Sequence, residues 1–172
     1  MGKKDDAGPE EGFRQVYEGF DDYCQQFIRV IDPKWDASTR MFNIEYCLFL
    51  YGAALAIARG TGREDGYSAV LWAPYLSLFM DLEDSTKWAL KCEKECSKSV
   101  RLQEIRAAGN NTAQAVFYAG SHGRSGDLNT AENMNFLLLV FSELSKHMKE
   151  ASTSGQGIVE ASSLIYDSIV NG

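Results

Sequence analysis

Apolar side chains recur every three or four residues along most of this chain. Because an α-helix turns once in about 3.6 residues, such spacing gathers apolar side chains into one stripe along a helix. Segments that alternate apolar and polar residues, as half-buried strands do, are not evident. The pattern predicts an all-α fold, and its first helix, Glu11 to Ile31, carries Phe13, Val16, Tyr17, Phe20, Cys24, Phe27, Ile28 and Ile31 on the apolar stripe.

Helix-breaking residues set the expected boundaries in the first third of the chain. Asp32-Pro33 should end the first helix, because proline brings no amide donor and pushes the preceding residue out of the helical region. A second helix is predicted from Ala37 to Arg59, with a side-chain oxygen of Asp36 or Ser38 capping its first turn. Its second half is apolar nearly all round, which predicts a central position in the fold.

The later helices are bounded by similar signals. Whether Ser68 to Ala108 forms one long helix or two is left open by the sequence. Gly109-Asn110-Asn111 predicts a stop, with a restart at Thr112. Thr130 is expected to cap the next helix, and a turn over Ser152 to Gly157 to precede the last one. The result is a bundle of about five to seven helices.

Length and charge place limits on the class of protein. With 172 residues the chain suits one domain, predicted over 11–172 after a disordered tail over 1–10. A formal net charge of −7 argues against binding nucleic acids or anionic membrane surfaces. The densest apolar run, Tyr46 to Ala58, is shorter than the roughly 20 residues that span a bilayer. Four cysteines within helical patterns suggest reduced thiols, so we expect a cytoplasmic protein.

Two Gly-Arg turns suggest an internal similarity. Ala58 precedes Gly62-Arg63 by the same step that separates Ala119 from Gly123-Arg124. Each turn joins a helix rich in small residues to a strongly apolar one. Two helical hairpins related by an approximate repeat would explain this, and a chance match among glycines and alanines is the alternative.

The loop from Gly120 to Asp127 is the most site-like segment of the sequence. Its glycines expose backbone amides, and His122 and Arg124 could hold an anionic group beside the start of the following helix. If the two Gly-Arg turns converge, Arg63 joins the same site. The alternative is a solvated turn between two helices, which is the usual role of such a loop.

Other polar clusters are assigned structural roles. Glu143 and His147, one turn apart, are expected to form a surface pair on the outside of an apolar helix. Cys92 and Cys96 are expected to pack as small side chains, with a soft-metal site or a redox pair as the alternative. Asp21-Asp22 is expected on a solvated face. No metal and no cofactor is predicted.

Two hypotheses on function follow. The first is a non-enzymatic helical protein-interaction module, such as an adaptor, chaperone-like or immunity-type factor, with a protein partner or self-association. The second is a small ligand-binding protein or enzyme that holds an anionic small molecule with its Gly/Arg loops. Aromatic side chains are enriched at interfaces and also fill cores. Those that bear on the first hypothesis are Tyr17, Tyr23, Tyr46, Tyr51, Trp72, Tyr75, Phe79 and Trp88.

Overall fold

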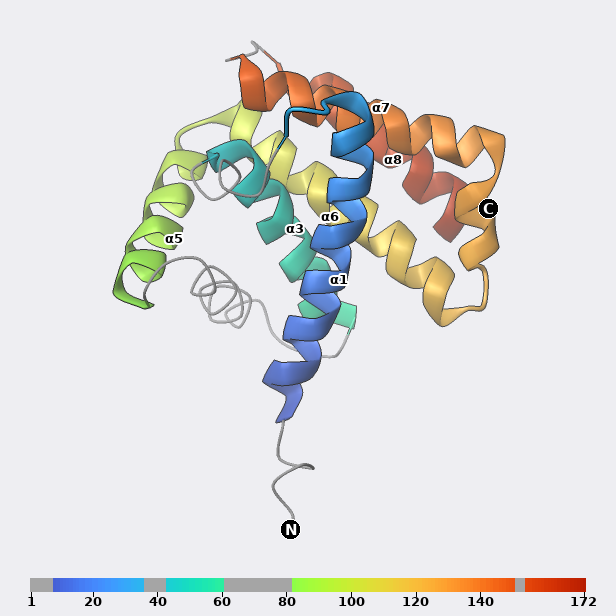
Figure 1. Ribbon diagram of the computed structural model, residues 1–172, viewed down its shortest axis with the longest axis horizontal. Helices are drawn as coiled ribbons and strands as arrows, with labels where there is room; N and C mark the ends of the chain where they lie inside the picture. The colour runs from blue at the N-terminus through green and yellow to red at the C-terminus, as the bar shows by residue number, and fades with distance from the viewer. Residues whose placement is uncertain (1–7, 36–42, 61–81, 151–153) are drawn as a thin grey trace.

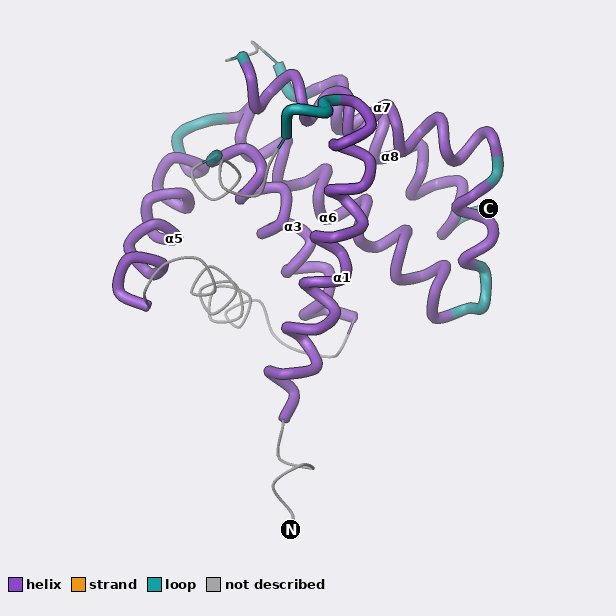
Figure 2. Tube along the Cα trace, viewed as in Figure 1, coloured by secondary structure: helices purple, strands orange, loops and turns teal. Residues whose placement is uncertain are grey.

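The computed structural model describes residues 8–35, 43–60, 82–150 and 154–172. These residues form six α-helices and one short 3-10 helix, and no strand occurs among them (Figure 2). The predicted all-α bundle is therefore confirmed. The helices are α1 (Gly8–Ile31), α3 (Ile44–Gly60), α5 (Leu82–Ser97), α6 (Val100–Ser121), the 3-10 helix η2 (Ser125–Asn129), α7 (Ala131–Lys149) and α8 (Gln156–Val170).

Helix α1 ends where the sequence predicts. The amide of Asp32 still donates to the carbonyl of Ile28, at 2.7 Å, and Pro33 then stops the series. The helix starts at Gly8, earlier than the predicted Glu11. Residues 1–7 lie outside the described part, so the predicted tail stays a prediction there.

Helix α3 begins at Ile44, so the predicted start at Ala37 is wrong. Asn43 is not helical, and its side-chain oxygen accepts a hydrogen bond from the amide of Tyr46 at 2.9 Å. An asparagine at this position satisfies an amide of the first turn, which has no partner within the helix. The two expected caps, Asp36 and Ser38, lie outside the described residues. The predicted central position is confirmed by complete burial of the segment from Tyr46 to Ala54.

The region left open by the sequence contains two helices from Leu82 onward. Helix α5 ends at Ser97, and α6 begins after Ser99, whose hydroxyl oxygen accepts from the amide of Leu102 at 3.2 Å. The predicted stop at Gly109-Asn110-Asn111 is wrong, because α6 continues through it to Ser121. Residues 61–81 lie outside the described part.

The backbones of α3 and α6 touch at two glycines. A methyl group built on Gly52 would lie 1.9 Å from the carbonyl oxygen of Arg106, and one built on Gly109 would lie 1.9 Å from that of Phe49. The side-chain amide of Asn110 donates to the carbonyl of Gly52 at 3.1 Å. Gly109 and Asn110 therefore serve a close contact between helices, and tertiary packing overrides their tendency to end one.

Five aromatic rings form a closed circuit that joins α1, α3 and α7. The centroid of Phe20 lies 6.3 Å from that of Phe49, and Phe49 lies 5.8 Å from Phe141. Phe141 lies 5.0 Å from Phe27, which lies 5.2 Å from Tyr23. Tyr23 closes the circuit at 6.4 Å from Phe20. Ring contacts at these distances add to the free energy gained from apolar burial.

The remaining helices pack around the α3–α6 pair. Helix α8 packs against α6 and α7, and α1 contacts α3 and α7. Helix α5 packs against α3 and α6 and lies at the edge of the fold, on the side away from the C-terminus (Figure 1). Within the described ranges, every helix lacks the length of apolar sequence that crossing a membrane requires.

The glycine contact gives a first prediction. We expect Gly52→Ala and Gly109→Ala each to lower the free energy of unfolding by about 1–3 kcal/mol, because the added methyl meets backbone that cannot move aside without separating the helices. Gly19→Ala is the matched control, since a methyl there meets nothing within 4 Å on a helix. It should stabilise the protein by about 0.5–1 kcal/mol. Urea denaturation measures all three, and equal stabilities would contradict the contact.

Candidate functional site

A surface hollow of about 520 Å³ opens where α1, the end of α6 and η2 meet. Its volume lies within the range of about 300–1,000 Å³ that is usual for small-molecule sites. We call it the loop hollow, because it includes part of the Gly120 to Asp127 loop that the sequence singled out. It is lined by Tyr23, Val116, Phe117, Gly120, Ser121, Ser125, Leu128 and Asn129.

The walls of the loop hollow are aromatic and aliphatic. The ring of Phe117 lies 5.8 Å from the buried Phe20, and the Tyr23 ring lies 6.4 Å from the same residue. Val116 and the buried Leu128 add aliphatic surface. The hollow is therefore connected through Phe20 to the aromatic circuit of the core, which fixes its wall in place.

Its polar groups are hydroxyls and an amide, and none of the described side chains that line it carries a charge. Ser121, Ser125 and Asn129 are exposed, and the Ser125 hydroxyl oxygen lies 4.0 Å from where a methyl on Gly120 would sit. Burial, and next the adjacent Cys24, raise the pKa of the Tyr23 hydroxyl. This hydroxyl therefore stays protonated at physiological pH, and the hollow is neutral.

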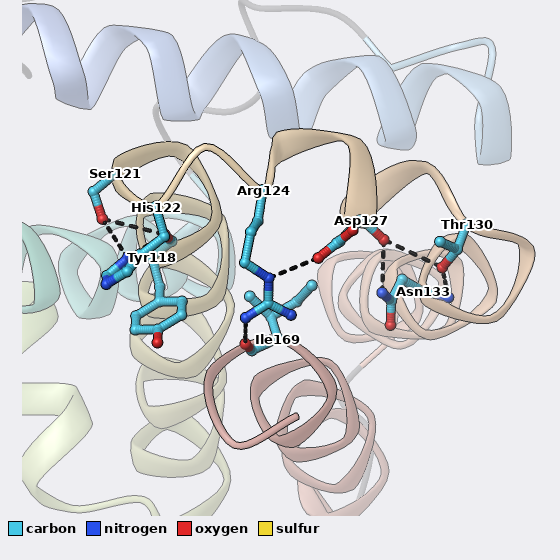
Figure 3. A network of polar contacts seen from close by, with 8 residues as sticks. All are labelled: Tyr118, Ser121, His122, Arg124, Asp127, Thr130, Asn133 and Ile169. Atoms are coloured by element: carbon cyan, nitrogen blue, oxygen red, sulfur yellow. Dashed lines mark hydrogen bonds and ion pairs between the residues drawn. The ribbon is translucent and has the colours of Figure 1, made fainter.

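Arg124 anchors the loop that contributes Ser125, Leu128 and Asn129 to the hollow. Its Nε donates to a carboxylate oxygen of Asp127 at 2.7 Å, and its Nη1 donates to the carbonyl of Ile169 at 2.9 Å (Figure 3). The first bond lies within the loop, and the second reaches the last turn of α8. The guanidinium thus ties η2 to the end of the chain.

The side chains of His122 and Arg124 make contacts in different places. Its ring stacks on that of Tyr118 with centroids 3.9 Å apart, and its Nδ1 lies 2.9 Å from the Tyr118 carbonyl oxygen (Figure 3). Neither His122 nor Arg124 lines the loop hollow. Arg63 lies outside the described residues, so the predicted convergence of Arg63, His122 and Arg124 on an anion stays a prediction.

The other end of the loop is held by the cap of α7. The hydroxyl oxygen of Thr130 accepts from the amide of Asn133 at 3.3 Å, as the sequence predicts. The Asn133 side chain also donates to the carbonyl of Asp127 at 2.7 Å (Figure 3). Together with Arg124, these bonds fix η2, which carries Leu128 and Asn129 into the hollow wall.

His147 is buried, so its predicted place on the outside of α7 is wrong. Only 2% of it is exposed, and its Nδ1 lies 3.3 Å from Nη1 of Arg101. Arg101 also pairs with Glu45 in the first turn of α3, at 2.9 Å. Since Arg101 can only donate, His147 accepts at Nδ1 and carries its proton on Nε2, which is buried without a partner among the described residues. Glu143 pairs with Lys146 instead, at 3.1 Å.

Asp21 is also buried rather than solvated. Its carboxylate accepts hydrogen bonds from the hydroxyl of Tyr46 and from the side-chain amide of Gln25, the latter at 3.1 Å. Asp22, the other half of the predicted acidic face, is exposed. The carboxylate therefore joins α1 to α3 inside the bundle.

All four cysteines are buried and carry free thiols. A hydrogen bond with Cys47, and next burial, raise the pKa of Cys92, and burial raises those of Cys24 and Cys96. The indole of Trp88 donates to the sulfur of Cys47 at 3.4 Å. These contacts are those of packed side chains between α3 and α5. In the part of the chain that the structure describes, no group of three or more His, Cys, Asp or Glu residues could hold a metal ion.

The sequence indicated the loop, and Tyr23 as one of several aromatic residues suited to an interface, but it missed Phe117 and the meeting of the two rings. Tyr23 and Phe117 are half-buried aromatic residues from helices far apart in the sequence, and only the fold brings them together. One signal was available in the sequence. Phe117 is followed one helical turn later by Gly120, and a glycine at that spacing leaves room next to the large ring. Comparisons with models of protein families, with curated protein sequences and with solved structures gave no match.

The environment of His147 gives a prediction on pH. Burial, and next the Arg101 guanidinium, lower its pKa below 6.5, although Glu143, Glu45 and Glu104 act in the opposite sense. Between pH 7 and 5 the unfolded chain therefore takes up a proton that the folded chain does not, and stability should fall. In urea denaturation, we expect His147→Gln to reduce the change of stability with pH. His122→Gln, which replaces an exposed ring, should leave that change as it is in the wild type. Identical slopes for wild type and His147→Gln would contradict the assignment.

Proposed function

We propose that this chain is a non-enzymatic helical module that binds a small molecule and that the loop hollow is its binding site. The observation that carries the proposal is the lining, whose described residues are aromatic and aliphatic in the walls and uncharged, with Ser121, Ser125 and Asn129 around them. Apolar centres with polar rims and few charges are typical of surfaces that bind other molecules.

The placement of the reactive side chains supports the same proposal. His147 and the thiols of Cys24 and Cys92 lie in the packed core and do not line the loop hollow. Arg124 and Asp127 are bonded to each other. The chemistry at the hollow is therefore that of contact and hydrogen bonding, which suits recognition.

A glycine in the wall allows a test that leaves the fold intact. Gly120 lies near the end of α6, and a methyl on it would meet only the Ser125 hydroxyl, at 4.0 Å. We expect Gly120→Leu to fill the hollow while raising helix stability slightly, because leucine is a better helix former than glycine. Binding of Nile red, a neutral apolar dye, should weaken by about tenfold or more.

Gly19→Leu is the matched control for this experiment. It places the same side chain on a helical glycine with open space around it, on α1 and outside the hollow lining. Nile red affinity, followed by fluorescence titration, should be that of wild type. Equal affinity of wild type and Gly120→Leu, or no dye binding by the wild type, would contradict the assignment of the site.

A protein partner or self-association is the second candidate, and the interface-like lining of the hollow favours it. We expect sedimentation velocity to show either association that grows with concentration or a complex with a captured partner, and Gly120→Leu to abolish it. Two results together would contradict this candidate. The first is a single monomeric species at all concentrations, and the second is that wild type and Gly120→Leu capture the same proteins or none.

We propose the cytoplasm as the compartment of this module. The support is the set of four buried, free thiols, which suits a reducing environment.

A further inference from the structure

The lining of the loop hollow carries information on the charge of its occupant. A charged group that enters an uncharged hollow loses part of its hydration and gains no partner of opposite sign, so it binds there less tightly than a neutral group of the same size. The charged residues adjacent in sequence to lining residues are Asp22, Arg124 and Asp127. Arg124 and Asp127 are engaged with each other, and Arg124 also with the carbonyl of Ile169 (Figure 3), while Asp22 is exposed to solvent. Among the described residues, the lining therefore offers no charged partner to either an anion or a cation.

The walls and the rim together describe an amphipathic shape. Tyr23 and Phe117 contact the buried Phe20 with centroid distances of 6.4 and 5.8 Å, so a further ring in the hollow would extend an existing aromatic cluster. The Ser125 hydroxyl and the Asn129 amide stand on the η2 side of the same hollow. A ligand that buries a ring against the walls can place one polar group on that side.

We propose that the loop hollow binds a small neutral molecule that carries an aromatic ring and one hydroxyl or amide group. This inference rests on the proposed function and specifies the chemistry of its ligand. It differs from the anionic ligand expected from the sequence, because that ligand depended on Arg124 and His122, which the structure places outside the hollow.

Two probes that share one ring system test the inference. At pH 7, 2-naphthol is neutral and offers a hydroxyl, whereas 2-naphthoate is an anion of similar size. We expect 2-naphthol to displace Nile red from the wild type. The affinity of 2-naphthoate should be lower by at least about tenfold. Amide chemical shifts of residues 116–129 should move with 2-naphthol, which locates the binding.

Removal of the rim amide tests the hydrogen bond. Asn129→Ala should lower the affinity for 2-naphthol by about fivefold to tenfold, as expected for the loss of one hydrogen bond. Asn135→Ala, which truncates an exposed asparagine on α7, should leave the affinity unchanged. Circular dichroism of both variants verifies that the fold is retained.

The outcomes separate this inference from the proposed function. If 2-naphthoate binds as tightly as 2-naphthol, the inference of a neutral ligand is overturned. If neither probe displaces Nile red, but Gly120→Leu still weakens binding of the dye, the proposed ligand class is wrong and the proposed site is kept. If the wild type does not bind the dye and 2-naphthol shifts no amide of residues 116–129, both fail.

Discussion

The close approach of α3 and α6 at Gly52 and Gly109 fixes the frame on which the other helices pack. Two helices whose backbones touch leave no room for side chains between them, so their relative position has little freedom. One half of α6 then carries Arg101 to Glu45 in the first turn of α3. The other half carries Phe117 to the loop hollow. A shift at the glycines would therefore move both the partly buried Arg101–Glu45 ion pair and the candidate site.

The loop hollow depends on this frame and on a loop that is tied down at both ends. Arg124 bonds η2 to the last turn of α8, and Asn133 bonds it to the start of α7. A site held by such bonds is formed before its ligand arrives, which reduces the entropy lost on binding. Arg124 thus contributes to the hollow by positioning Leu128 and Asn129, although its side chain does not line it.

The sequence predicts what local signals decide and fails where distant parts of the chain compete with them. The stop at Pro33 and the cap at Thr130 are confirmed, because each acts on its own turn of helix. Gly109-Asn110-Asn111 has the composition of a helix stop, yet contact with α3 keeps it helical. The loop at Gly120 was found from its glycines. Tyr23 was named among the aromatic residues suited to an interface, but its meeting with Phe117 was not predicted, because the two come from different helices and no local pattern reports that meeting.

An interhelical nuclear Overhauser effect tests the α3–α6 contact most directly. A methyl on Gly109 would lie 3.0 Å from the Cα of Phe49, so the α-protons of these two residues must be close in space. With both resonances assigned, the account predicts a strong cross-peak between them. Its absence, with cross-peaks from Gly109 only to protons of α6 itself, would show that the two backbones do not touch and would contradict the frame described above.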